Sequence, residues 1–313
     1  MPIAKVSDEE FIAVWRTMQS AARVSEALEI TEREVLRRRR KLEEKYGVRL
    51  GAADPRSPTY TIREHSPRVD CTMENGVIVV GSDAHYWPGV ISTAHKAFVS
   101  VIKEIKPEIV VLNGDLFDGA RVSRHPRSDW SATPTVKDEL QAVSDRVFEI
   151  KQAAGSAKVW WCMGNHDMRF EAKLANTVPE FEGVKGFSLQ DHFPETPMTI
   201  SLFVNRNLMI KHRYHSGIHA TFQNAMKSGV NMCTGHLHRL QATIYSDYNG
   251  TRWGIDCGTL AETNGDHMHY GEDNPMNHCS GFAVLTIRNG QLLHPEFCSV
   301  HDGAAFFRGE QVA

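Results

Sequence analysis

The sequence predicts a layered α/β sandwich flanked by helices and preceded by a small all-α unit. Apolar runs with the length and composition of buried strands occupy residues 76–81, 108–114, 158–164, 208–212 and 230–235. Helical stretches near residues 90–105, 136–154 and 218–228 separate some of these runs. Asn249-Gly250 and Asn289-Gly290 each lie between alternating runs, as hairpin turns do, so we expect the later strands to be antiparallel.

The composition of the 313 residues excludes several classes of protein. Hydrophobic residues make up 41% and charged residues 23%, as in an ordinary globular protein. No run approaches the roughly 20 apolar residues of a membrane span, and the first residues lack the apolar core of a secretory signal. The net charge of −3 excludes a globally basic nucleic-acid binder but allows a local basic patch. Six scattered cysteines without a CxxC pair favour reduced thiols and a cytoplasmic location.

Residues 1–50 predict three short helices. Ser7 with Glu10, and Thr31 with Glu34, have the spacing of capping boxes at helix N-termini, and Gly47 is placed as a C-terminal cap. A short helix, a tight turn and a basic third helix together predict a helix-turn-helix unit. Prolines punctuate residues 51–67, which predict a linker, so residues 68–313 are expected to form the α/β domain.

The predicted third helix carries a run of five cations. These are Arg37, Arg38, Arg39, Arg40 and Lys41. They would spread around more than half of the helix, so several can face DNA phosphates together. Against this, residues 1–50 hold 11 Lys and Arg beside 9 Asp and Glu, and the run could pair with neighbouring glutamates. We expect DNA as the partner, with a protein-docking unit, a homo-oligomer contact or a solubilising appendage as alternatives.

Each of the five apolar runs ends in side chains that can bind a metal ion. In chain order these are Asp83 and His85, Asp115 and Asp118, Asn165 with His166 and Asp167, His212 and His215, and His236 and His238. Loops that leave strand ends are where α/β folds build their sites. Carboxylate, amide and imidazole donors without thiolate suit Mn²⁺, Fe²⁺ or Zn²⁺. About seven ligands are too many for one ion and suit two ions that share a carboxylate.

The ordered motifs resemble those of a known family. They are Asp83-x-His85, Gly114-Asp115-Leu-Phe-Asp118, Gly164-Asn165-His166-Asp167, the post-strand His212, and Gly235-His236-Leu-His238. Over residues 77 to about 260 this set resembles the five motifs of the calcineurin-like metallophosphoesterases. The second and third motifs are more similar to SbcD-type DNA-repair nucleases than to Ser/Thr protein phosphatases, which carry Arg where this chain has Gly119. A helix-turn-helix ahead of the domain is also similar to phage-encoded phosphoesterases.

This resemblance implies a metallophosphoesterase fold for residues 68–313 and a role for each motif residue. One ion would be held by Asp83, His85, Asp115 and His238, and the second by Asp115, Asn165, His212 and His236, with Asp115 bridging. His166 corresponds to the family's catalytic histidine, and Asp118 to the carboxylate that orients it. Arg213 stands where the family usually has Gly after the fourth-motif His, so His215 remains an alternative ligand to His212.

The activity expected from these roles is two-metal hydrolysis of phosphodiester bonds. A metal-bound hydroxide would attack, His166 would act as general acid, and Mn²⁺ is the first choice of ion, before Fe²⁺ or Zn²⁺. Nucleic acid, and DNA in particular, is the expected substrate. The alternatives are a phosphatase or pyrophosphatase of nucleotides or other small phosphoesters, and a DNA-binding regulator whose phosphoesterase domain is not catalytic.

Two insertions and two single residues bear on the substrate. The first insertion holds Arg121, Arg124, His125, Arg127 and Trp130, a mixture that suits a nucleic-acid strand, although an exposed polar loop would look the same. Arg169 and His215 are further candidates to bind substrate, and Arg169 could instead form a salt bridge at a helix start. The second insertion, residues 262–280, brings His267, His269, Asp273 and His278. A lid, a third metal site and an ordinary surface loop are all open for it.

Overall fold

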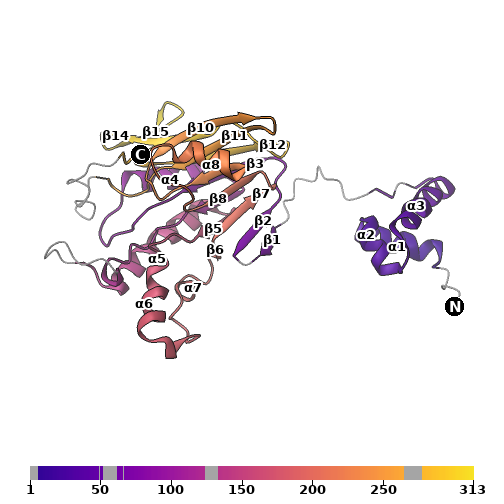
Figure 1. Cartoon of the computed structure of the whole chain (residues 1–313), viewed down its shortest axis with the longest axis horizontal. Helices are drawn as coiled ribbons and strands as arrows, with labels where there is room; N and C mark the ends of the chain where they lie inside the picture. The colour runs from indigo at the N-terminus through magenta and orange to yellow at the C-terminus, as the bar shows by residue number, and fades with distance from the viewer. Residues whose placement is uncertain (1–5, 49, 52–61, 66, 124–132, 264–276) are drawn as a thin grey trace. The chain divides into compact units, whose positions relative to one another are not determined.

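The computed structural model describes residues 6–48, 50–51, 62–65, 67–123, 133–263 and 277–313 (Figure 1). The chain forms two compact units, Met1–Ser57 and Pro58–Ala313. Among the residues described, none of the helices has both the length and the apolar character that a membrane span requires.

The first unit consists of three helices, α1 (Asp8–Met18), α2 (Ala21–Leu28) and α3 (Glu32–Tyr46). The expected caps are present: the Ser7 hydroxyl accepts from the Glu10 amide, and Thr31 and Glu34 form a complete capping box. Gly47 ends α3 in the left-handed conformation. The core is small and apolar, and consists of Phe11, Trp15, Val24, Val35, Leu42 and Leu50.

Two cations of the basic run are engaged inside this unit. Arg38 lies 3.1 Å from the Asp8 carboxylate, and Arg39 lies 3.2 Å from that of Glu43, one helical turn away. Both guanidinium groups are half-buried, because each also covers an aromatic ring of α1. The other members of the run, Arg37, Arg40 and Lys41, are exposed.

The second unit is built on two sheets. The seven-stranded sheet has the order β1 (Ile62–His65), β2 (Arg68–Cys71), β7 (Ser201–Val204), β8 (Leu208–Lys211), β9 (Asn231–Thr234), β11 (Gly250–Cys257), β10 (Leu240–Asp247). The nine-stranded sheet has the order β16 (Glu310–Gln311), β15 (Ala304–Phe307), β14 (Glu296–His301), β12 (Gly281–Arg288), β3 (Gly76–Gly81), β4 (Ile109–Leu112), β5 (Lys158–Cys162), β6 (Met198–Thr199), with β13 (Gln291–Leu292) paired to β12.

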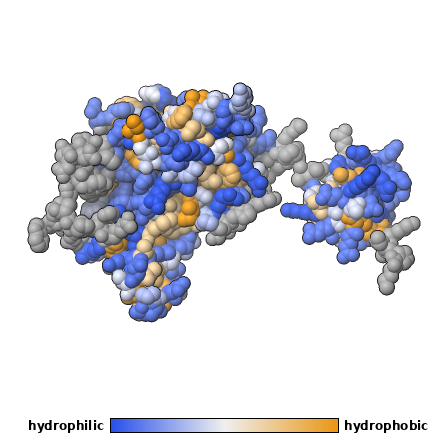
Figure 2. All heavy atoms as spheres, viewed as in Figure 1, coloured by the Kyte–Doolittle hydropathy of each residue, from blue (hydrophilic) through white to orange (hydrophobic). Residues whose placement is uncertain are grey.

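Helices cover the outer faces of the sheets. Side chains of α4 (Thr93–Ile105) and α5 (Val136–Ala154) form a core with the nine-stranded sheet, and α8 (Ala220–Ser228) packs on strands of the seven-stranded sheet. A second core, which includes Ile78, Val111 and Ile210, lies between the two sheets. Short helices α6 (Arg169–Thr177) and α7 (Leu189–His192) and 3-10 turns at Ala120–Val122 and Pro179–Phe181 complete the unit. With the apolar residues inside, the surface in Figure 2 is largely hydrophilic.

The layered α/β prediction is confirmed. The five apolar runs form β3, β4, β5, β8 and β9, and both Asn-Gly pairs connect antiparallel strands. Strands β3, β4 and β5 are parallel, as are β8 and β9, so within each sheet their carboxyl ends share one edge. This arrangement gathers the polar residues that follow the five strands.

Candidate active site

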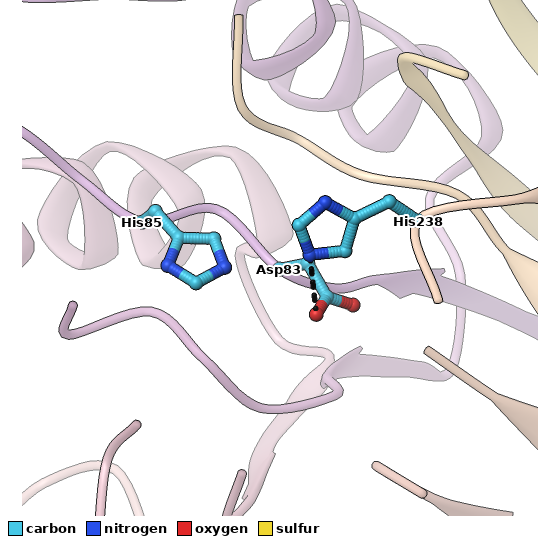
Figure 3. A group of neighbouring side chains, drawn as sticks. All are labelled: Asp83, His85 and His238. Atoms are coloured by element: carbon cyan, nitrogen blue, oxygen red, sulfur yellow. Dashed lines mark ion pairs between the residues drawn. The ribbon is translucent and has the colours of Figure 1, made fainter. Parts of the chain in front are cut away.

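The polar strand ends converge into three neighbouring groups of potential ligands. The groups are Asp83, His85 and His238; Asp115, His212 and His236; and His85, Asp118 and His166, and within each the ligand atoms lie within 4.8 Å of one another. In Figure 3 the Asp83 carboxylate faces the His238 ring, and His85 lies to one side of this pair. The five segments that carry these residues are far apart in the sequence, so the site exists only in the folded domain.

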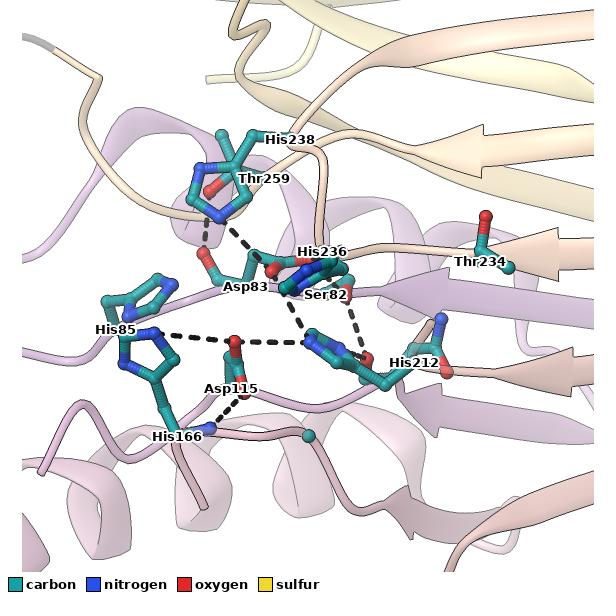
Figure 4. A network of polar contacts seen from close by, with 12 residues as sticks. Ser82, Asp83, His85, Asp115, His166, His212, Thr234, His236, His238 and Thr259 are labelled. Carbon is teal, nitrogen blue, oxygen red and sulfur yellow. Dashed lines mark hydrogen bonds and ion pairs between the residues drawn. The ribbon is translucent and has the colours of Figure 1, made fainter. Parts of the chain in front are cut away.

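The two carboxylates at the centre are buried and face histidines. The Asp83 Oδ1 atom lies 3.1 Å from His238 Nε2, and Asp115 Oδ2 lies 3.1 Å from His212 Nε2. His212 Nε2 is also 4.0 Å from Asp83 Oδ1, which joins the first two groups. Figure 4 shows the Asp115 side chain between those of His166 and His212. Asp115 is therefore in contact with His212 and lies beside His166.

Two buried ligand atoms in this space have neither a hydrogen-bond nor an ion-pair partner within the described parts of the chain. They are His85 Nε2 and Asn165 Oδ1. Such orphaned atoms are rare because an unpaired buried polar group is destabilising. Oxygen and imidazole nitrogen are the donors that divalent Mn, Fe and Zn accept, so these residues fit metal ions.

The second ring nitrogen, Nδ1, is satisfied in two histidines of the site. His85 Nδ1 lies 2.8 Å from Asp118 Oδ1, and His212 Nδ1 lies 2.8 Å from the Asn113 carbonyl oxygen. An acceptor at Nδ1 fixes the ring so that Nε2 keeps its lone pair for a cation. The structure thus places His212 among the potential ligands. It places His215 in none of the three groups.

Burial and neighbouring charges set the protonation of this centre. Burial alone would raise the pKa of Asp83, but the His238 and His212 imidazoles hold that pKa below its usual value. Burial acts to lower the pKa of His212, yet the negative charges of Asp83 and Asp115 outweigh it and raise that pKa to about 10. A histidine must be neutral to bind a cation, so metal binding at His212 would release a proton.

The backbone at the ligands is unusual. Of the 13 non-glycine residues with positive φ in the described parts of the chain, five are potential ligands: Asp83, His85, Asp115, His236 and His238. Left-handed residues other than Gly cost free energy and gather at functional sites. The glycines before the ligands allow close approach, because a Cβ at Gly164 would lie 2.1 Å from Asp115 Oδ1 and one at Gly235 would lie 2.0 Å from Ser82 Oγ.

Asp167 ties the third motif to the second. Its buried carboxylate accepts five N–H hydrogen bonds at 2.9–3.1 Å, from the backbone of Asp115, Leu116, Phe117 and Gly164 and from the Trp161 indole. Every one of these donors lies in the loop that carries Asp115 or in the segment that leads to His166. The sequence marked Asp167 only as one of several polar residues at a strand end, and the structure gives it this supporting role.

His166 and Asp118 meet as the sequence resemblance implied. His166 Nδ1 lies 2.9 Å from Asp118 Oδ1, and His166 Nε2 lies 3.9 Å from Asp115 Oδ2. Burial acts to lower the pKa of His166, but hydrogen bonding to Asp118 and the charge of Asp115 raise it, with Arg169 opposing the rise. Burial likewise acts against the charge on Asp118, and the His166 and His85 imidazoles bring the pKa of Asp118 below its usual value. Asp118 therefore orients two histidines at once.

Glu139 is a supporting residue that the sequence did not single out. This α5 residue has no exposed surface, and its carboxylate accepts from the backbone amides of Gly119 at 2.8 Å and Ala120 at 3.2 Å. Burial raises the pKa of Glu139 to about 7. The contact fixes the backbone immediately after Asp118. A signal was available, because Glu139 stands four residues before Val143, on the face of α5 that its apolar residues bury.

Some of the predicted substrate-binding residues contact other groups of the protein, and others lie outside the described residues. Arg121 donates to the carbonyl oxygens of Thr133 at 2.7 Å and Pro134 at 3.1 Å, so its guanidinium is used within the loop. Arg169 lies against His166, and the His215 ring lies against that of Tyr214. Arg124, His125, Arg127 and Trp130 of the first insertion, and His267, His269 and Asp273 of the second, lie outside the described residues.

The chain matches one protein family and is similar to several solved structures. The calcineurin-like phosphoesterase family model matches residues 76–240, and a search of curated proteins returned no match. Among solved structures, an archaeal phosphodiesterase has 15% identity and a TM-score of 0.35, over 71% of this chain and 99% of that chain. A Thermotoga maritima protein has 12% identity and a TM-score of 0.35, over 72% and 99%. A protein serine/threonine phosphatase from Saccharomyces cerevisiae has 9% identity and a TM-score of 0.35, over 72% and 80%.

The family assignment rests on the sequence match. The matched residues make up more than half of the chain and include the converging side chains from Asp83 to His238. The three solved structures have 9–15% sequence identity and TM-scores of 0.35, so the assignment does not depend on them. The chain therefore belongs to the calcineurin-like phosphoesterases and is a metal-dependent phosphoester hydrolase.

Proposed function

We propose that this enzyme hydrolyses phosphodiester bonds in DNA with two divalent cations, Mn²⁺ first among them. The observation that carries the chemistry is the proximity of two groups of potential ligands: His212 Nε2 lies 3.1 Å from Asp115 Oδ2 and 4.0 Å from Asp83 Oδ1, and His166 lies beside Asp115. Asp83, His85, Asp115 and His238 would hold one cation, and Asp115, Asn165, His212 and His236 the other. Bound there, two dications would ease deprotonation of water and offset the charge that grows on the phosphoryl oxygens.

The protein's own contribution to the reaction is proton transfer. Asp118 accepts at His166 Nδ1, so His166 Nε2, which the Arg169 guanidinium contacts at 3.0 Å, is the nitrogen that would face the substrate. From Nε2 the imidazolium would give its proton to the oxygen that leaves phosphorus. His166 is outside the proposed ligand set, so His166→Asn should keep metal content and lose about 10²–10⁴ in kcat.

DNA as the substrate is supported by the first unit. The exposed Arg37, Arg40 and Lys41 occupy the side of α3 opposite the buried Val35 and Leu42. Three residues, 29–31, separate α2 from α3, as in helix-turn-helix units. Such a face can contact several phosphates. Arg38 and Arg39, engaged within the unit, are given no part in this contact.

A substrate panel with the Mn²⁺-loaded full chain tests the activity. We expect cleavage of bis-p-nitrophenyl phosphate over p-nitrophenyl phosphate, and cleavage of DNA over RNA and nucleotides; linear and circular DNA, single- and double-stranded, then separate exonuclease from endonuclease action. Activity confined to monoesters or nucleotides would overturn the proposal.

DNA binding by α3 needs its own test. The triple variant Arg37→Ala/Arg40→Ala/Lys41→Ala should weaken DNA binding and flatten its salt dependence by about 0.9 in the log–log slope for each phosphate that is no longer neutralised. The matched control is Arg16→Ala/Arg23→Ala, which removes exposed cations from α1 and α2. Equal salt slopes in all three proteins would contradict the DNA-binding role.

A further inference from the structure

The buried histidines of the site differ in how their second ring nitrogen is satisfied. His85 and His212 each have an acceptor 2.8 Å from Nδ1, whereas His238 Nδ1 is buried without a hydrogen-bond partner in the described parts of the chain. In Figure 3 the His238 Nε2 atom faces Asp83 and the other ring nitrogen points away from it. Metal-binding histidines almost always donate their second N–H to an acceptor, so His238 lacks a partner that the other two have.

The ring of His278 packs against the ring of His238. The two ring centroids are 4.6 Å apart and the planes are inclined by 48°. His278 is half-buried and stands just before β12, at the end of the second insertion. Its imidazole can accept a hydrogen bond through whichever ring nitrogen is unprotonated. Residue 278 lies beyond the stretch 76–240 that the family model matches.

Backbone hydrogen bonds fix the position of His278. The Cys279 amide donates to the His238 carbonyl oxygen at 2.7 Å, and the Thr259 amide donates to the Cys279 carbonyl oxygen at 3.2 Å. Thr259 in turn donates through its hydroxyl to the Asp83 carbonyl oxygen at 2.6 Å. The segment that presents His278 is therefore tied to the segments of two potential ligands.

We propose that His278 is a positioning residue whose ring nitrogen accepts the Nδ1–H of His238 when His238 Nε2 holds a cation. The rings are already in contact and the backbone is fixed, so this bond requires reorientation of side chains alone. Its effect is to hold His238 in one tautomer and one orientation. The proposal rests on the assignment of His238 to a cation in the proposed function, and it does not depend on the substrate.

Two substitutions separate hydrogen bonding from packing. His278→Gln keeps an acceptor and loses the ring, whereas His278→Phe keeps a ring and loses the acceptor. Calorimetric titration of the metal-free full chain with Mn²⁺ and with Zn²⁺ measures the affinity, and melting temperatures verify folding. We expect His278→Phe to weaken one of the two bound ions by about 10–100-fold and His278→Gln to stay within a few-fold of wild type. His301→Phe, at an exposed histidine of β14, is the control and should match wild type.

Each other outcome has a definite meaning. Wild-type affinity in His278→Phe would overturn the proposal, and a loss in His278→Gln alone would show that ring packing is what matters. Equal losses in both variants would also overturn the proposal, because they would indicate that the imidazole itself is required, for example as a direct ligand. A wild-type chain that binds no divalent cation would overturn this proposal together with the proposed function. Active wild type with an unaffected His278→Phe would overturn this proposal alone.

Discussion

The Arg169 guanidinium donates a hydrogen bond to His166 Nε2 at 3.0 Å, and its other nitrogen donates to the Asp118 carbonyl oxygen at 2.9 Å. A guanidinium cannot accept, so in this arrangement Nε2 carries the lone pair and the ring proton lies on Nδ1, toward Asp118. Asp115 and Asp118 favour the imidazolium form of His166, and Arg169 opposes it. If a phosphoryl oxygen of the substrate bound the Arg169 guanidinium in place of His166 Nε2, then Nε2 could be protonated. His166 would then hold the proton that it donates to the leaving oxygen.

Replacing Arg169 tests this relationship. Arg169→Ala should lower kcat/KM for a diester by about 10–100-fold, the worth of one charge-assisted hydrogen bond. Without the opposing cation the pKa of His166 rises further, so the basic limb of the pH–rate profile should move to higher pH. Arg169→Lys should fall between the two, because it keeps the charge without the planar fork. Arg288→Ala, at an exposed arginine of β12, is the control; an unchanged profile in Arg169→Ala would contradict the role.

The choice between His212 and His215 can be decided by metal content. His212 is buried against Asp115, and His215 lies outside the three groups. His212→Ala should therefore lose one of two bound ions, while His215→Ala should keep both. Atomic absorption on dialysed, folded protein measures the stoichiometry. Loss of an ion from His215→Ala with full retention in His212→Ala would reverse the assignment.

Asp167→Asn should destabilise the large unit severely. The carboxylate accepts five N–H bonds, and an amide would turn its own N–H₂ group toward some of those donors. Loss of at least two bonds to a charged acceptor predicts a fall of about 3–5 kcal/mol in the free energy of unfolding. Urea denaturation measures this. Asp191→Asn removes an exposed carboxylate that accepts from the Gly186 amide, and it should change stability by less than about 1 kcal/mol.

Glu139 predicts a pH dependence of stability. Its pKa in the folded protein is about 7, above the usual 4.5, because burial disfavours the charge. The folded state thus binds more protons between these values, so the free energy of unfolding should fall as pH rises from about 4.5 to about 7. Glu139→Gln cannot titrate and should remove a fall on the order of 3 kcal/mol. Urea denaturation of metal-free protein at several pH values checks this, with the exposed Glu180→Gln as control. Parallel pH curves for wild type and Glu139→Gln would contradict it.

Local patterns predicted much of this molecule. Apolar runs that end in polar side chains predicted the strands. They also predicted the edge of the sheet at which the potential ligands lie, because parallel strands bring their carboxyl ends together. In the structure, the motif glycines before Asp115, Asn165 and His236 stand where a Cβ would collide with a neighbouring segment. These features depend on residues close together in the sequence.

Other parts of the site depend on contacts between distant residues. A run of five cations in the sequence does not reveal which of them form ion pairs within the first unit. The ion pair between Arg38 and Asp8 is seen only in the folded helices. Glu139 supports Gly119 from a helix 20 residues later, and His278 reaches His238 from 40 residues later. Helix periodicity can mark Glu139 as a residue that faces inward, but it does not say which distant segment that side chain contacts. Asp167 was visible as a polar residue, but three of its five donors come from residues 115–117, about 50 residues earlier, a segment that meets it only in the folded domain.

The left-handed backbone at Asp83, His85, Asp115, His236 and His238 has a consequence for ion exchange. Each such residue costs on the order of 1–3 kcal/mol, which the surrounding sheets must offset whether or not an ion is bound. The backbone itself, held by these sheets, therefore positions the ligand side chains. One divalent ion should replace another without rearrangement of the loops, at a rate set by dissociation of the first ion. The relative affinities of different ions should depend on the chemistry of the ligand atoms and not on a change in the shape of the site.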